Sequence, residues 1–556
     1  MDNMRMILFA ALGFVVLSLW QAWQNDYAPT SVPVSFEQAA IAGNTTNGVA
    51  NNNSNKNLDI PMPVMTNDDL PVSVDTSPAA DSSKLQSVQR VLIETDVFNA
   101  VIDTHGGDLR GSALKQYPVE SDKPEIPVIL FNDLNGKFYA SQGGLLSKEP
   151  TANHHSVYKT TASEYRLVDG QDSMEVVLSW AEQGIEIDKV FTFRRGQYLI
   201  DVTYRIKNNS TKPWNGRMYE QLQQKHFAES RKMLPTFTGA AISNADKRYE
   251  KIKFDDLAEE PVNQETDSGW LAMIQHYFVS AIIPESGKVH NYYSKVINTN
   301  SYVVGLYGPQ ISVAPGETHE VTVQVYSGPK IQEALEKIAP GLELTVDYGI
   351  LWFIAKPIFW LLDLIHSLVG NWGWAIILVT VVIKGIFYPL SAMGYKSMAR
   401  MRKVTPRLTA IRERYSNDKA RMNQAMMDFY KEEKINPLGG CFPILVQIPV
   451  FLALYWVLLE SVEMRQAPFM LWIQDLSIKD PIFILPLIMG VSMFVQQKLN
   501  PPPPDPIQAK VMQFLPIVFT AFFAFFPAGL VLYWVTNNIL SIFQQWTITK
   551  RIEAEK

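Results

Sequence analysis

The chain has 556 residues, of which 47% are hydrophobic, and a formal net charge of −6 at pH 7. This length allows two or three domains. Its one cysteine, Cys441, excludes a disulfide framework, a CxxC redox motif and a zinc site built from cysteines. GxSxG, Walker A and HExxH motifs are missing and the eight histidines are scattered. We therefore predict no catalytic residues, no metal, no cofactor and no enzymatic activity.

The N-terminus carries an apolar stretch over residues 6–23, preceded by Arg5. Trp20 and Trp23 stand where a signal peptidase would need small residues, and tryptophan suits a membrane interface. The sequence therefore favours an uncleaved signal anchor over residues 1–24. Residues 25–90 are rich in Asn, Ser, Thr, Pro and Asp, which predicts a flexible linker.

Residues 91–330 carry repeated patterns that are typical of β-strands. The segment SMEVVLSWAEQGIEIDKVFTFRRGQYLIDVTYRIKNNS alternates apolar and polar residues, and Gly, Pro, Asn or Ser bounds each run. Many short strands and few helical patterns predict a large β-sandwich domain, which the signal anchor would place outside the cytoplasm.

The second half is dominated by long apolar runs, and a helix needs about 20 such residues to cross a bilayer. We predict five spans over residues 372–390, 442–459, 482–496, 512–526 and 530–546. In terms of domains, span 2 lies within 371–391, spans 3 to 6 lie within 441–550, and a short tail covers 551–556. With the signal anchor, the predicted fold is a polytopic α-helical membrane protein of six spans.

Charge decides the topology of this half. The loop over residues 392–440 contains eleven Lys or Arg and five acidic residues, which places it in the cytoplasm. Within 331–370, the apolar segment 348–369 carries Lys356, Asp363 and His366 on one arc of a helix. Counting it as a span would put the basic loop outside, so we predict an interfacial amphipathic helix there. Both termini then lie in the cytoplasm.

Polar residues within the spans are the candidate site. Lys384 lies inside span 2, and two interpretations stay open: its stem reaches the interface, or its charge faces a hydrated cavity. Several neutral polar or aromatic side chains in the spans favour the cavity, although ordinary interhelical hydrogen bonds would use the same residues. These candidates are Thr380, Gln447, Trp534, Asn538 and Ser541.

The basic loop has the pattern of two helices, 395–415 and 418–434. Its charge could contact RNA, the ribosome or lipid, or could serve only to orient the protein in the membrane. Aromatic residues are not interleaved with the charges, so no specific nucleic-acid binding is predicted. The basic residues singled out are Arg400, Arg402, Lys403, Arg407, Arg412 and Arg414.

Four long motifs carry a family resemblance: GNWGWAIILVTVVIKGIFYPLSAMGYKSMARMRKVTPRL, NPLGGCFPILVQIPVFLALYWVL, SVEMRQAPFMLWIQDLSIKDPIFILP and FPAGLVLYWVTNNILSIFQQ. They resemble the core of the YidC/Oxa/Alb membrane insertases, and the resemblance extends over the whole chain in its Gram-negative form. It implies an insertase and chaperone for inner-membrane proteins. Its five core helices would form a hydrophilic groove that is open to the cytoplasm and the lipid.

The resemblance also implies where that groove is. The family holds one positive charge there, usually Arg, and Lys384 occupies that position, with Thr380, Gln447 and Trp534 at groove-lining positions. The implied partners are nascent inner-membrane proteins, the lipid bilayer and the Sec translocon, with the ribosome and signal recognition particle machinery as further candidates. The implied location is the bacterial inner membrane, with the linker and the large β-sandwich domain in the periplasm. Two alternatives are a small-solute transporter, whose inverted repeats are not evident, and a membrane-anchored periplasmic carbohydrate enzyme, which leaves five spans unexplained.

Overall fold

A computed structural model describes residues 87–133, 138–225, 236–298, 300–415, 418–433, 442–500 and 506–554. The predicted signal anchor and nearly all of the linker over 25–90 lie outside these residues. Within the described chain, residues 407–433 belong to a separate compact unit, and all other described residues belong to a second unit.

The strands form two large sheets, and nearly every pair of neighbouring strands is antiparallel. In spatial order, the first sheet contains β14 (Asn263–Thr266), β17 (His290–Asn298), β18 (Ser301–Tyr307), β11 (Trp214–Lys225), β5 (Tyr139–Ser147), β3 (Asp108–Pro118), β2 (Phe98–Asp103), β1 (Arg90–Glu94) and β7 (Glu164–Arg166), with β19 (Ile311–Val313) on β11 and β4 (Pro127–Ile129) on β3. The second contains β13 (Glu250–Ile252), β12 (Gly239–Ser243), β15 (Trp270–Ile274), β16 (Phe278–Ile283), β20 (Thr318–Pro329), β10 (Leu199–Asn208), β9 (Ile185–Arg194), β8 (Ser173–Glu182) and β6 (Lys159–Thr160).

Alternation of side chains explains these strands. In β10, Ile200, Val202 and Tyr204 point into the core while the residues between them are only half-buried. Gln183 and Gly184 connect β8 to β9 with φ of 49° and 83°, the left-handed conformation that a tight hairpin needs. Side chains of both sheets share one hydrophobic core. The prediction of a domain rich in β-strands is therefore confirmed.

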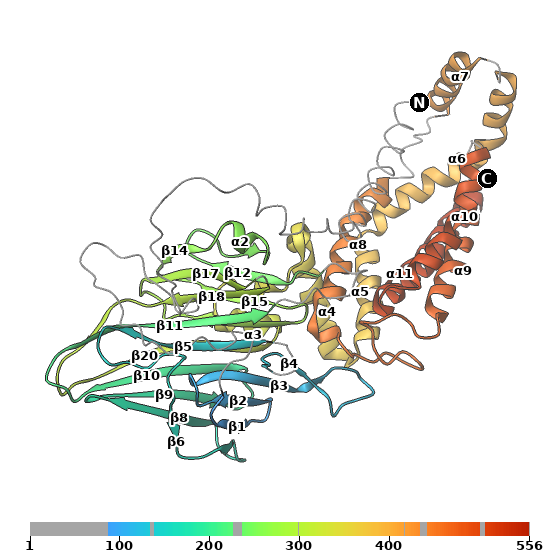
Figure 1. Cartoon of the computed structure of the whole chain (residues 1–556). Coiled ribbons are helices and arrows are strands. Elements are labelled where there is room, and N and C mark those ends of the chain that lie inside the picture. The colour runs from blue at the N-terminus through green and yellow to red at the C-terminus, as the bar shows by residue number, and fades with distance from the viewer. Residues whose placement is uncertain are drawn as a thin grey trace, which may run out of the picture. The chain divides into compact units, whose positions relative to one another are not determined.

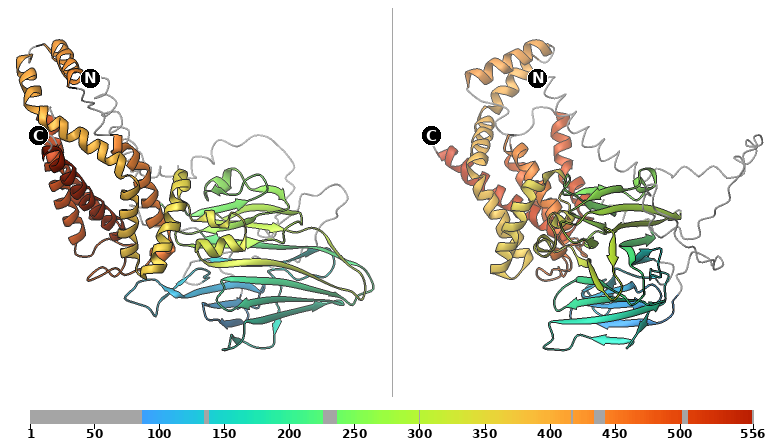
Figure 2. Two further views of the ribbon diagram at one scale, coloured as in Figure 1. Left: turned by 180° about the vertical axis from the view of Figure 1, so that it is seen from behind. Right: turned by 90° about the vertical axis from the view of Figure 1, so that its left-hand side faces the viewer.

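The helices follow the strands, apart from the short α2 (Asp256–Glu259). They are α3 (Gln332–Ile338), η1 (Leu342–Thr345), η2 (Gly349–Leu351), α4 (Trp352–Val369), α5 (Trp372–Ile386), α6 (Tyr388–Arg414), α7 (Lys419–Glu432), α8 (Phe442–Glu460), η3 (Val462–Met464), α9 (Ile484–Leu499), α10 (Pro506–Phe523) and α11 (Ala528–Ala554). Helix α11 packs against α9 and α5, α9 packs against α10, and α4 packs against α5 and α8. Figures 1 and 2 show these helices side by side in a bundle.

The segment predicted as span 2, residues 372–390, is not one straight helix. Helix α5 ends at Ile386, and α6 begins at Tyr388 after a bend of 68°. Pro389 causes this break, because it has no N–H and its ring would clash with the carbonyl of a continuing helix. The sequence therefore showed that an apolar helix begins here but missed the bend.

Length and composition give only partial support for membrane spans among the described residues. Gly349–Val369 is the one helix that is long and apolar enough to cross a membrane, and α5 with α6 would pass only as one broken span. The apolar helices Val446–Glu460, Ile484–Leu499 and Lys510–Phe523 are shorter. Only 17% of the apolar window in Gly349–Val369 is buried, so most of its apolar surface faces outward.

The C-terminal end of α8 is bound tightly to the β domain. Val462, in η3, is 2% exposed and belongs to the hydrophobic core of the two sheets. Lys330, directly after β20, forms a buried ion pair with Glu460 at the end of α8, with 3.3 Å between Nζ and Oε2. Arg465 donates to the carbonyl of Pro118 at 2.6 Å. A core contact, an ion pair and a hydrogen bond therefore hold this helix end in place.

Candidate functional site

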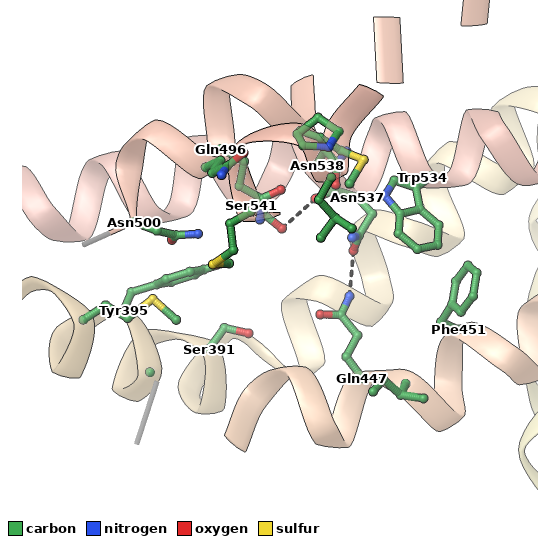
Figure 3. A pocket seen from close by; sticks show the side chains of 18 of the residues that line it. Ser391, Tyr395, Gln447, Phe451, Gln496, Asn500, Trp534, Asn537, Asn538 and Ser541 are labelled. Atoms are coloured by element: carbon green, nitrogen blue, oxygen red, sulfur yellow. Dashed lines mark hydrogen bonds between the residues drawn. The ribbon is translucent and has the colours of Figure 1, made fainter. Parts of the chain in front are cut away.

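A cavity of about 330 Å³ lies among α6, α8, α9, α10 and α11. Figure 3 shows polar side chains that approach it from different helices, and apolar side chains complete its wall. None of the lining residues in the described part of the chain is charged. The polar wall includes Ser391, Tyr395, Gln447, Asn537, Asn538 and Ser541.

Lys384 lies just behind this wall. Its side chain projects from α5, is 9% exposed, and donates from Nζ to Ser541 Oγ at 2.8 Å and to Gln447 Oε1 at 3.5 Å. Both of these partners line the cavity. Both are also neutral, and within the described ranges no carboxylate forms an ion pair with Lys384. A buried lysine whose described partners are all neutral is costly inside an apolar bundle, and such residues usually line a functional pathway.

Amide hydrogen bonds join the helices that form the wall. Gln447 Nε2 of α8 donates to Asn537 Oδ1 of α11 at 2.7 Å, a bond that is drawn in Figure 3. Asn538 Nδ2 donates to Ser492 Oγ of α9 at 2.9 Å. Asn537 and Asn538 are consecutive, so α11 is bonded to both α8 and α9. Neutral hydrogen bonds of this kind hold helices together in a membrane at modest energy.

Trp534 forms the apolar part of the wall. Its ring lies edge-on to Phe451, with 4.6 Å between the ring centroids, and it contacts Phe523 at 4.8 Å. Thr380 is different: it is 1% exposed, and its Oγ1 donates to the carbonyl of Ile376 at 2.6 Å in its own helix. The structure thus places Gln447, Trp534, Asn538 and Ser541 on the cavity wall, Lys384 directly behind it, and Thr380 away from it.

Sequence reasoning missed part of this wall. Ser391 and Tyr395 of α6 and Gln496 and Asn500 of the α9 region also line the cavity. Gln496 and Asn500 are four residues apart, which is the spacing of one helix face. That spacing is the sequence pattern from which Gln496 and Asn500 could have been predicted to line the cavity. Ser391 and Tyr395 are also four residues apart, but their place on the wall depends on the bend before Tyr388, which sequence reasoning missed.

The basic residues of the α6–α7 hairpin are mostly exposed. Arg400, Arg402 and Lys403 precede the boundary at residue 407, and Lys403 Nζ donates to the carbonyl of Ile552 at 3.1 Å. The remaining three belong to the separate unit. In it, Arg407 pairs with Glu433 at 2.7 Å, Arg412 is half-buried, and Arg414 is exposed. Helix α6 starts at Tyr388, seven residues before the helix start predicted for the hairpin.

Two family models match adjoining parts of the chain. The YidC periplasmic domain matches residues 90–361, and the 60Kd inner membrane protein matches residues 364–555. Membrane protein insertase YidC of Methylococcus capsulatus is 49% identical over 558 residues, which cover 100% of this chain and 99% of that relative. Its counterpart in Pseudomonas fluorescens is 48% identical over 562 residues, with the same two coverages.

Solved structures are less similar. A crystal structure of an active YidC insertase, with its first transmembrane domain resolved, is 19% identical, covers 83% of this chain and 93% of its own, and has a TM-score of 0.37. A galactose mutarotase-like protein from Lactobacillus casei covers 43% of this chain and 99% of its own, at 12% identity and a TM-score of 0.29. Both TM-scores are below 0.5, so the assignment rests on the sequence matches. By its full-length relatives, the chain belongs to the YidC family of membrane protein insertases.

Proposed function

We propose that this protein inserts hydrophobic segments of nascent inner-membrane proteins into the lipid bilayer through the cavity among α6, α8, α9, α10 and α11. It has six spans, of which five form the insertase core, with the β domain in the periplasm and both termini in the cytoplasm. The family is one of insertases, so we abandon the carbohydrate-enzyme alternative. The observation that carries the proposal is a buried cation, Lys384, bonded to two neutral side chains of the cavity wall.

The topology follows from charge and from the short turn before α5. Helix α4 ends at Val369 and α5 begins at Trp372, so two residues separate them. If α4 crossed the membrane, α5 would return at once, and the basic segment 392–440 would lie outside. We therefore propose that α4 lies in the periplasmic interface. Its exposed residues support this, because Trp352 and Trp360 accompany the charged Lys356 on the outward surface.

The cavity would lower the barrier to moving a polar tail across the membrane. Each unsatisfied polar group costs several kcal/mol in hydrocarbon. Amides and hydroxyls in the wall, such as Gln447, Asn537 and Ser541, can bond to a peptide backbone on its way through. Burial of the substrate's apolar helix in lipid then drives its release, so this step needs no nucleotide.

Lys384 would select acidic tails. An incoming carboxylate can replace Ser541 or Gln447 as the partner of its ammonium, and a charge-assisted hydrogen bond is stronger than a neutral one. The family usually has Arg at this position. A single ammonium can supply the same charge, although it cannot form the paired hydrogen bonds of a guanidinium.

Further partners are proposed from the family resemblance and from charge. The Sec translocon would cooperate in the insertion of larger proteins. The basic α6–α7 hairpin, with exposed residues such as Arg400 and Arg414, would contact the ribosome, the signal recognition particle machinery or anionic lipid.

The test is insertion into liposomes by the purified full-length protein. The substrate is a small Sec-independent membrane protein with an acidic translocated tail, compared with the same substrate whose tail acids are changed to amides. Wild type, Lys384→Arg, Lys384→Met and Lys384→Ala are measured, and methionine keeps most of the side-chain volume without the charge. We expect wild type and Lys384→Arg to insert the acidic substrate, and both neutral variants to lose most of that activity.

The substrate with a neutral tail separates charge from packing. If Lys384 acts by its charge, wild type and Lys384→Met insert the neutral tail equally well. Equal insertion of the acidic tail by all variants would refute the role of Lys384 and keep the insertase. No insertion above that of empty liposomes, with the protein shown to be folded, would refute the insertase and return attention to a solute transporter.

A further inference from the structure

A second cavity, of about 250 Å³, lies in the β domain, far in sequence from the membrane helices. It opens where the two sheets meet: β11, β17 and β19 belong to the first sheet and β20 to the second. Its volume is below the roughly 300–1,000 Å³ of pockets that take drug-sized ligands. It is therefore large enough for one small ring and too small for a peptide segment.

One buried polar side chain in this cavity has an unused acceptor. His290, the first residue of β17, is 2% exposed. Its Nδ1 is 2.7 Å from the carbonyl oxygen of Lys288, and because a carbonyl can only accept, Nδ1 carries the proton. Burial lowers the pKa of His290, so the ring is neutral and Nε2 keeps a lone pair. Within the described residues Nε2 has no hydrogen-bond partner.

Gly308 shows that the free edge of this ring faces open space. Its own N–H donates to the carbonyl of Met218 at 2.8 Å, which fixes the backbone beside the ring. A methyl group added to Gly308 would lie 3.7 Å from His290 Cδ2 and 3.9 Å from Nε2, and it would meet no atom closer than that. The space beside Nε2 is therefore part of the cavity, with Gly308 at its wall.

The remaining wall defines the chemistry of a ligand. Met218, Ile311 and Val321 supply an apolar surface, while Gln310 and Ser312 supply exposed donors and acceptors. The two charged side chains, Lys288 and Glu285, neutralise each other across 2.8 Å. The wall therefore has no net charge to hold an anion. No group of three or more His, Cys, Asp or Glu is placed to hold a metal in the described ranges.

We propose that this cavity binds a small neutral polyol of the size of a single sugar ring. A hydroxyl donates to His290 Nε2, neighbouring hydroxyls bond to Gln310 and Ser312, and the C–H face of the ring packs on Ile311 and Val321. A polar cavity holds water when it is empty. Hydroxyl groups can replace the hydrogen bonds of that water, which an apolar ligand would lose.

The test is ligand-observed NMR titration of the purified full-length protein with D-glucose, D-galactose, N-acetylglucosamine and myo-inositol, with inorganic phosphate as a charged probe. We expect saturable binding of at least one polyol with a Kd on the order of 1 mM, and none of phosphate. Gly308→Ala fills the space beside Nε2 and should weaken binding about tenfold or more. His290→Asn keeps a donor near the Lys288 carbonyl, removes the acceptor and should weaken binding similarly.

Gly385→Ala is the matched control, because nothing lies within 4 Å of a methyl group there and the position is in α5, outside the β domain. It should leave polyol binding unchanged. Absence of saturable polyol binding to the wild type would overturn the proposal. Polyol binding that is unchanged in both Gly308→Ala and His290→Asn would also overturn it. Phosphate that binds and displaces the polyol would overturn it as well. If His290→Asn proves unfolded, Gly308→Ala decides alone, since it clashes with nothing.

Discussion

The buried ion pair between the β domain and α8 gives the sharpest prediction. Lys330 and Glu460 have side chains that are 1% and 4% exposed, and Nζ of Lys330 also donates to the carbonyl of Thr345 at 3.1 Å. Lys330→Met keeps much of the volume but leaves the Glu460 carboxylate buried without its cation. Removing one partner of such a pair costs about 3–5 kcal/mol. For a domain of 150–250 residues, that lowers the midpoint of thermal unfolding by about 6–20 °C.

The double variant Lys330→Met/Glu460→Gln separates the pair from general packing. It removes both charges, so most of the lost stability should return, which a double-mutant cycle would measure as coupling above about 2 kcal/mol. Lys337→Met is the control: its pair with Glu333, at 2.7 Å in α3, is more than 70% exposed on both sides, so its loss should barely change stability. The assay is thermal unfolding of the purified full-length protein, with hydrogen exchange of β20. Equal loss in Lys330→Met and Lys337→Met, or a double variant as unstable as the sum of the single ones, would refute this reasoning.

Three further predictions concern other contacts. Gly373→Ala should destabilise the protein by about 1–3 kcal/mol in thermal unfolding, because its methyl group would clash with the ring of Phe469. Gly385→Ala should not destabilise it, because the space there is open, and equal effects of the two variants would contradict this packing. Burial raises the pKa of Glu463 to about 7, so the folded state binds more protons than the unfolded state between pH 4.5 and 7, and stability falls as pH rises through that window. Glu463→Gln should abolish this fall and stabilise the protein at pH 8 by on the order of 3 kcal/mol, and an unchanged pH profile would show that Glu463 is not the titrating group. Gln447→Leu removes the bonds of α8 to Asn537 and Lys384, so it should slow insertion of acidic and neutral tails alike, unlike Lys384→Met; a loss confined to acidic tails would contradict this.

The β domain was predictable because each strand is patterned along its own length. The inward residues of β10 alternate with half-buried ones, and the turn at Gly184 is marked by its own residue type. Buried charge is not marked in this way. Lys189 occupies an inward position of β9, where it is 1% exposed and donates to the carbonyl of Gly143 at 3.0 Å. The residue that accepts this hydrogen bond lies 46 residues away in sequence, so the sequence of β9 alone does not predict the contact.

The candidate site was also predictable only in part from the sequence. Lys384 stands out because a charge inside an apolar run is costly, and the amides of α11 are visible as a polar stripe. Which residues meet across the cavity could not be read from the sequence, since Lys384 and Ser541 are 157 residues apart. The bend at Phe387 changes the direction of the chain and places Ser391 and Tyr395 on the wall. Proline marked that bend, but only the surrounding helices fix its angle.

Two buried lysines show that the partners of a buried charge distinguish a structural role from a functional one. Lys330 pairs with a carboxylate inside the junction between β20 and α8, so its charge is compensated in the resting protein. Lys384 is nearly as buried but bonds only to a hydroxyl and an amide, and no described carboxylate pairs with it. Keeping an uncompensated cation within an apolar bundle is costly, and an arriving anion recovers part of that cost. Giving Lys384 a carboxylate partner like that of Lys330 therefore tests this distinction. In Ser541→Asp, the new carboxylate would neutralise the charge of Lys384 within the protein. This variant should suppress insertion of acidic tails and leave insertion of neutral tails unaffected.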